Sequence, residues 1–152
     1  MIDVYTDGSC LGNPGNGGWA FLVKKNDIIS SRSGFVLNTT NNQMELTAAI
    51  KAIEFLDTND VINLLTDSNY VKNGITSWIK NWKINNWTNS SKQPVKNKDL
   101  WERLDELNSI KSVNWQWVKA HSTNNYNNQV DLLARQSAES LTESSFDGVQ
   151  RL

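Results

Sequence analysis

Two apolar runs in this chain each end on an aspartate. Residues 2–5 lead through a threonine to Asp7, and residues 61–65 lead through a threonine to Asp67. Each run predicts a β-strand that carries its aspartate to its C-terminal end. If the two strands are parallel neighbours, both carboxylates reach one edge of the sheet, where open α/β folds bind ligands. Because like charges repel at short range, such a pair requires either a cation or a shared proton.

Two further acids stand beside apolar stripes with helical spacing. Glu45 precedes Leu46, and Asp131 follows Val130. Each of the four acids also has a structural explanation, since aspartates often cap turns and acids favour helix N-termini. Spacing alone leaves both explanations open, although four acids at the ends of elements favour a site.

The elements that must position these acids follow from periodicity and turn signals. Residues 19–23 and 28–37 predict strands that follow the first one in an antiparallel arrangement, joined by turns. Residues 40–43 have the Thr-x-x-Gln form of a capping box, and the apolar residues after them predict a helix that reaches residue 56. Further along the chain we expect a strand at 61–66, short helices over 69–83, a helix over 98–107, a strand at 113–117 and a helix over about 130–141.

This order predicts an α/β fold, a mixed sheet with helices on its faces. A right-handed crossover places the strand at 61–66 beside the first strand, in parallel. We expect one domain over residues 1–141, with a basic protrusion at about 72–98. The tail, 142–152, shows no pattern and is expected to be loose.

Composition narrows the class of protein. The 152 residues are 38% hydrophobic and 20% charged, and no apolar run approaches the ~20 residues that cross a bilayer. The N-terminus lacks the pattern of a secretory signal. The single cysteine, Cys10, cannot form an internal disulfide, and the single histidine, His121, cannot build a histidine-rich zinc site. We therefore expect a cytoplasmic protein that needs no membrane. Nothing in the sequence demands more than a monomer or an obligate protein partner.

The net charge of −1 conceals a basic segment. Residues 72–98 contain six lysines and no acid, so this segment can attract an anionic polymer to one surface. The same segment holds Trp78, Trp82 and Trp87. Trp78 and Trp82 share one helical face and are predicted to pack on the core, which is compatible with lysines that face phosphates.

Four segments carry a specific family resemblance. They are residues 5–15 (YTDGSCLGNPG), 40–46 (TNNQMEL), 65–71 (LTDSNYV) and 117–121 (WVKAH). Together they closely resemble type 1 ribonuclease H in its bacterial form, and the likeness runs in order over residues 1–139. The resemblance implies a five-stranded sheet in which only the second strand is antiparallel. It also implies hydrolysis of the RNA strand of an RNA·DNA hybrid, which leaves a 5′-phosphate and a 3′-hydroxyl.

By the same resemblance, four acids bind the metal ions: Asp7, Glu45, Asp67 and Asp131. Together with His121 they form the catalytic set. Hard oxygen ligands suit two Mg²⁺ ions, for which Mn²⁺ can substitute. The implied nucleic-acid contacts are Cys10, Asn13, Asn41 and Asn69 in the minor groove, Thr40 and Asn97 at a DNA-strand phosphate, and Trp78, Trp82, Lys83, Trp87, Lys92 and Lys96 in the protrusion.

Two other functions share part of this pattern. A module that binds hybrids without cutting them would not need all four acids and the histidine. A DNA-cutting nuclease would share the acids but not the residues that sense 2′-hydroxyls. The protrusion is also less basic than is usual in the family, so we expect hybrid binding to be weaker and less sensitive to salt.

Overall fold

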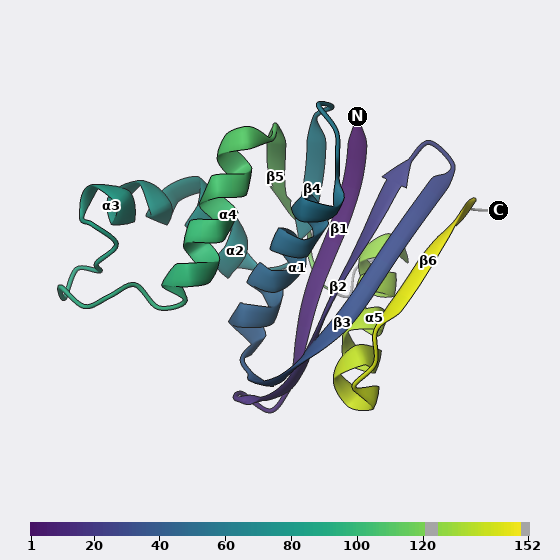
Figure 1. Ribbon diagram of the computed structural model, residues 1–152, viewed down its shortest axis with the longest axis horizontal. Helices are drawn as coiled ribbons and strands as arrows, with labels where there is room; N and C mark the ends of the chain where they lie inside the picture. The colour runs from purple at the N-terminus through teal and green to yellow at the C-terminus, as the bar shows by residue number, and fades with distance from the viewer. Residues whose placement is uncertain (121–124, 150–152) are drawn as a thin grey trace.

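The computed structural model describes residues 1–120 and 125–149. In this part of the chain, six strands form one sheet (Figure 1). Their bounds are β1 Ile2–Leu11, β2 Gly15–Lys25, β3 Ile28–Thr39, β4 Ile62–Thr66, β5 Val113–Trp117 and β6 Ser144–Val149. The spatial order of the strands is β5-β4-β1-β2-β3-β6.

The predicted pairing at the centre of the sheet is confirmed. β4 is parallel to both β1 and β5, whereas β2 is antiparallel to β1 and to β3. In the parallel ladder Thr6 lies opposite Thr66. Asp7 and Asp67, the next residue of each segment, therefore leave this ladder at the same level.

The structure has one strand more than the five predicted, because β6 adds a second antiparallel strand, beside β3. It arises within the tail, where the sequence shows no pattern. Most of its side chains are exposed, so the strand lacks the inside-outside alternation that predicts strands. Backbone pairing and an ion pair between Asp147 and Arg32, at 3.0 Å, hold it instead.

Helices cover both faces of the sheet, as predicted (Figure 1). Their bounds are α1 Asn41–Phe55, α2 Asn69–Asn73, the π-helical segment η1 Gly74–Trp78, α3 Ile79–Ile84, α4 Lys98–Ile110 and α5 Asn125–Ser140. The capping box at the start of α1 is present: the Thr40 side chain accepts from the Gln43 backbone, and the Gln43 side chain accepts from the Thr40 backbone.

The alternation of side chains along the strands divides the core into two. Val4 and Phe21 point to the face covered by α1 and α4, where the larger cluster lies. Tyr5 and Leu22 point to the other face, where they contact residues of α5, among them Val130. Burial of both faces fixes the register of the strands, since a slip of one residue would exchange the two faces.

Two glycines allow helices to approach the sheet at its functional end. A Cβ added to Gly8 would lie 2.4 Å from the backbone nitrogen of Glu45, and one added to Gly18 would lie 2.0 Å from the carbonyl oxygen of Ala134. Any larger residue would push α1 or α5 outward. These close approaches bring Glu45 beside Gly8 of β1 and seat α5, which carries Asp131, on the opposite face.

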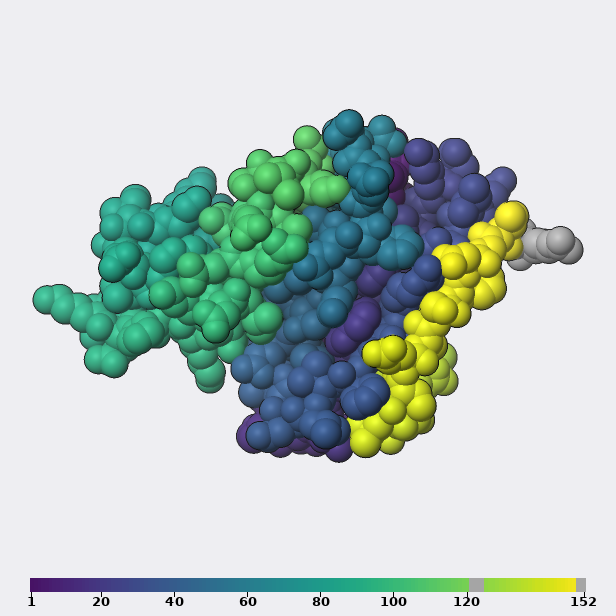
Figure 2. Space-filling view, in the orientation of Figure 1, coloured from purple at the N-terminus to yellow at the C-terminus, as the bar shows by residue number. Residues whose placement is uncertain are grey.

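The segment from η1 to the start of α4 extends from one end of the molecule (Figure 2). Aromatic contacts connect it to the core: the Trp82 ring lies 5.3 Å from that of the fully buried Trp101 and 6.4 Å from that of Trp87. Within residues 1–120 and 125–149, no helix has the length and apolar character to cross a membrane.

Candidate active site

Three carboxylates meet where the parallel ladder between β1 and β4 ends. Asp7 lies within β1, one residue beyond the part that pairs with β4, so the prediction that it ends its strand is wrong: β1 continues to Leu11 beside β2. Asp67 directly follows β4, and Glu45 projects from the second turn of α1. One oxygen from each lies within 4.8 Å of the other two. Asp7 and Glu45 are buried, with 4% of each residue exposed. The structure thus brings together three of the four predicted acids in a space that suits a shared cation.

The backbone at Gly8 holds two of these acids in place. The Gly8 amide donates to Oδ1 of Asp7, at 2.9 Å, and to Oε1 of Glu45. On the other strand, the Ser68 backbone donates to the Thr66 hydroxyl, while the Ser68 hydroxyl caps α2 by accepting from Val71. Local hydrogen bonds therefore fix the turn that contains Asp67.

Burial and mutual repulsion disfavour the charged forms of the acids. Burial raises the pKa of Asp7 from its ordinary 3.8 to about 7; a hydrogen bond with Glu45 opposes this rise, and the charges of Asp67 and Asp131 add to it. The pKa of Glu45 is also raised well above its usual range, first by burial and then by the charge of Asp7. Near neutral pH the cluster therefore retains a proton unless a cation offsets its charge.

Asp131 borders the same site from α5. It lines a cavity of about 320 Å³ together with the three clustered acids, Ser9, Asn41 and Ser68. Its carboxylate lies outside the cluster and pairs with Arg135 one turn later, at 3.5 Å. The fourth predicted acid is thus present at the rim. The pairing with Arg135 was not predicted, although i,i+4 spacing of opposite charges on a helix could have indicated it.

The predicted minor-groove residues lie at the same end of the sheet as the acids. The Cys10 thiol donates to the Thr39 carbonyl, at 3.2 Å, and the Asn41 backbone donates to the Asn13 side chain, at 3.1 Å. Asn69 is exposed at the start of α2, on the side of Asp67. The predicted catalytic His121 lies outside the residues that the structure describes.

Thr40 and Asn97, the two predicted phosphate-binding residues, are joined through Gln43. The Gln43 side chain accepts from the Thr40 backbone, at 3.3 Å, and donates to the Asn97 side chain, at 3.1 Å. Gln43 was predicted only as a capping residue of α1. Its contact with Asn97 spans 54 positions of the chain, so no local signal could have indicated it.

The protrusion residues divide into buried and exposed sets. Trp82 and Trp87 pack against the main core, whereas Trp78 is 39% exposed. Lys92 and Lys96 are exposed in the loop before α4, and Lys83 pairs with Asp105 of α4, at 3.2 Å. Trp82 and Trp87 therefore anchor a segment whose lysines remain at the surface. The prediction that Trp78 packs on the core is wrong, because its ring contacts Tyr70 and Trp82 at the surface.

The fold and this site define a class of protein. A mixed α/β sheet carries a cluster of carboxylates where the ladder of its central parallel strands ends, beside an open cavity lined by polar side chains. These features are those of an α/β protein with an acidic site of the kind that holds divalent cations.

Comparisons with known proteins identify the family. The RNase H family model matches residues 1–139. A protein named Ribonuclease H from Hydrogenovibrio crunogenus is 50% identical over 141 residues, which cover 93% of this chain and 97% of the relative. Another of that name, from Ehrlichia ruminantium, is 54% identical over 134 residues, covering 88% and 92%. The chain belongs to the ribonuclease H family, and it is an endoribonuclease, a phosphodiester hydrolase.

Solved structures agree with this assignment. LC9-RNase H1, described as a type 1 RNase H with the type 2 active-site motif, has a TM-score of 0.85 and 29% identity, and covers 97% of this chain and 77% of its own. LC11-RNase H1, solved in complex with an RNA/DNA hybrid, has a TM-score of 0.71 at 18% identity, covering 92% and 98%. At that lower identity the likeness concerns the fold alone.

Proposed function

We propose that this chain cleaves the RNA strand of RNA·DNA hybrids with divalent metal ions held by Asp7, Glu45, Asp67 and Asp131, leaving a 5′-phosphate and a 3′-hydroxyl. The observation that carries the proposal is the cluster of three carboxylates whose oxygens lie within 4.8 Å of one another. Membership of the ribonuclease H family supports the choice of substrate.

The donor set fits hard divalent cations. All three clustered groups are carboxylates, and Mg²⁺ and Mn²⁺ prefer oxygen ligands. The raised pKa values of Asp7 and Glu45 support the same conclusion, because a buried cluster with excess negative charge is stabilised by a bound cation. When bound there, a pair of Mg²⁺ ions supplies activated water and stabilises charge on the leaving 3′ oxygen.

Each acid has a proposed role set by its position. By the family resemblance, Asp7 would hold both ions, while Glu45 and Asp67 would each hold mainly one. Asp131, which lines the same cavity from outside the cluster, would complete the site more loosely. For His121 we propose assistance with proton transfer or with departure of the product.

The residues around the cavity would select the hybrid. Cys10, Asn13, Asn41 and Asn69 would sense ribose 2′-hydroxyls in the minor groove, which is how proteins distinguish RNA from DNA. Thr40 and Asn97 would hold a phosphate of the DNA strand. The lysines of the protrusion would contact further phosphates and add a salt-dependent share of affinity.

One cleavage assay separates this function from its alternatives. The protein is incubated with a labelled hybrid of about 12 to 20 base pairs, with the matching double-stranded DNA and with single-stranded RNA, each with Mg²⁺ or with chelator. We expect cleavage of the hybrid RNA strand only, and only with metal. Binding of the hybrid without cleavage would support the non-cleaving module, and cleavage of the DNA duplex would support the DNA nuclease.

A further inference from the structure

The Asn97 side chain is held at both ends of its amide. Its Nδ2 donates to the Tyr70 hydroxyl, at 3.1 Å, and its Oδ1 accepts from the Gln43 side chain, at 3.1 Å. Asn97 precedes α4 with φ of 61°, and its side chain does not cap the helix. The Gln43 side-chain oxygen accepts from the Thr40 backbone, so its nitrogen must be the donor to Asn97, and this fixes Oδ1 as the accepting end of the Asn97 amide. The Nδ2 atom carries a second hydrogen that can be donated to a phosphate oxygen.

Both partners of Asn97 are themselves fixed. The Tyr70 hydroxyl also accepts from the indole N–H of Trp101, at 3.0 Å, and Trp101 is completely buried. The Gln43 side-chain oxygen accepts from the Thr39 hydroxyl, at 2.7 Å, as well as from the Thr40 backbone. The Asn97 amide is therefore connected on one side to the core beneath the protrusion and on the other to the start of α1.

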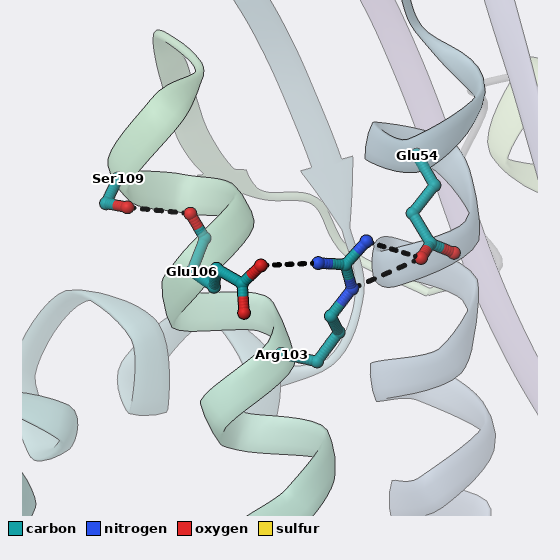
Figure 3. Close-up of polar contacts among 4 residues, drawn as sticks. All are labelled: Glu54, Arg103, Glu106 and Ser109. Atoms are coloured by element: carbon teal, nitrogen blue, oxygen red, sulfur yellow. Dashed lines mark hydrogen bonds and ion pairs between the residues drawn. The ribbon is translucent and has the colours of Figure 1, made fainter.

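A second contact holds α1 and α4 together further along both helices. The Arg103 guanidinium of α4 donates to Glu54 of α1 from two nitrogens, at 2.8 and 3.2 Å, and it also reaches Glu106, at 2.8 Å (Figure 3). The two helices are thus tied near their starts by Gln43 and Asn97, and later by Arg103 and Glu54. Such double attachment restricts movement of Asn97 relative to Thr40.

We infer that Tyr70 and Gln43 are positioning residues, which hold the Asn97 amide toward a DNA-strand phosphate and so set where the uncut strand lies. The inference rests on the proposed role of Thr40 and Asn97. Neither Tyr70 nor Gln43 lines the cavity beside the acids. The expected effect is thus on binding of the hybrid in both ground and transition states, which changes KM and leaves kcat nearly constant.

The test is a double-mutant cycle between Tyr70→Phe and Asn97→Ala. Tyr70→Phe retains the ring that packs against Trp101 and removes only the hydroxyl. With Mg²⁺ and a hybrid substrate, we expect KM to rise about 3- to 10-fold, as loss of one neutral hydrogen bond predicts, with kcat within about twofold of the parent. In the Asn97→Ala background the same substitution is expected to have no further effect, because Tyr70 acts through Asn97.

A matched control removes a comparable hydrogen bond elsewhere. Asn108 accepts from the indole N–H of Trp115, at 2.9 Å, away from the phosphate pocket, and Asn108→Ala should leave KM unchanged. A Tyr70→Phe protein with an unchanged KM, or one whose effect adds fully to that of Asn97→Ala, would overturn the inference. If Asn97→Ala itself left KM unchanged, the proposed phosphate pocket would fail, and the positioning role with it, while the cleavage assay would still report on the enzyme's function.

Discussion

Asp7 is expected to destabilise the folded protein when no metal is bound. Its pKa is raised from 3.8 to about 7, chiefly by burial, so the unfolded chain releases this proton more readily. The contribution of protonated Asp7 to the stability of the metal-free protein is therefore fully present below about pH 4. It is lost as the pH rises from there through 7. Asp7→Asn should abolish cleavage, because it removes a proposed metal ligand. Because an asparagine side chain cannot ionise, the same substitution should increase metal-free stability at pH 8 by about 2 kcal/mol, which is a rise of several degrees in Tm.

The measurement combines thermal unfolding in chelator with hybrid binding and cleavage. Binding of the hybrid should remain nearly intact, because the substitution leaves the proposed DNA contacts in place. Asp3→Asn, on the same strand and outside the cavity, is the matched control and should retain cleavage. A variant at Asp7 that unfolds at a lower temperature than the parent would contradict the role of burial and repulsion.

The same raised pKa values predict that metal affinity depends on pH. Carboxylates must lose their protons to bind Mg²⁺, and the pKa of Asp7, near 7, means that a proton is displaced at neutral and lower pH. The apparent Kd for Mg²⁺ should therefore rise by about tenfold per pH unit below pH 7. Calorimetric titration in two buffers of different ionisation enthalpy would measure both the affinity and the released proton. An affinity that is constant between about pH 5.5 and 8 would contradict this expectation.

At the scale of elements, the lysines of the protrusion are expected to contribute unequally. Lys96 is exposed in the loop, whereas Lys83 already pairs with Asp105. Each phosphate contact contributes about 0.9 to the slope of log K against log salt. Lys96→Ala should reduce that slope by nearly this amount, and Lys83→Ala by less than half of it. Equilibrium binding to a hybrid between about 50 and 200 mM salt, in chelator, measures both slopes. Equal reductions for the two variants would show that the ion pair has no such effect.

Elements whose apolar residues are periodic could be predicted from the sequence. The α1 helix, with its capping box, and the parallel pairing of β1 with β4 were predicted, and with this pairing the meeting of Asp7 and Asp67. Spacing left Glu45 as an open candidate, and only the family resemblance assigned it to the site. The sixth strand could not be, because its formation depends on pairing with β3 and not on a pattern of its own. The Gln43 and Tyr70 contacts with Asn97 were missed for the same reason: they join elements that are distant in sequence.

At the scale of the whole molecule, the acids of the site and the stabilising strand β6 occupy different regions of the sheet. The acids come from β1, α1, the end of β4 and α5, which converge only when the fold is complete. β6 lies on the far edge, with β2 and β3 between it and β1. Contacts of β6 can therefore be removed without touching the carboxylates.

A chain that ends at residue 143 should accordingly lose stability and keep its chemistry. It lacks the pairing of β6 with β3 and the Asp147–Arg32 ion pair. It also lacks the hydrogen bond between the Ser144 and Ser33 hydroxyls, at 2.5 Å; the Ser33 hydroxyl in turn accepts from that of Ser137 of α5, at 2.9 Å. We expect Tm to fall by about 3 to 8 °C, with kcat changed less than about twofold at a temperature where the protein remains folded. A chain ending at residue 149 retains all these contacts and is the matched control. If kcat falls in the folded chain that ends at residue 143 but not in the chain that ends at residue 149, then β6 helps to position α5, and with it Asp131, in the site.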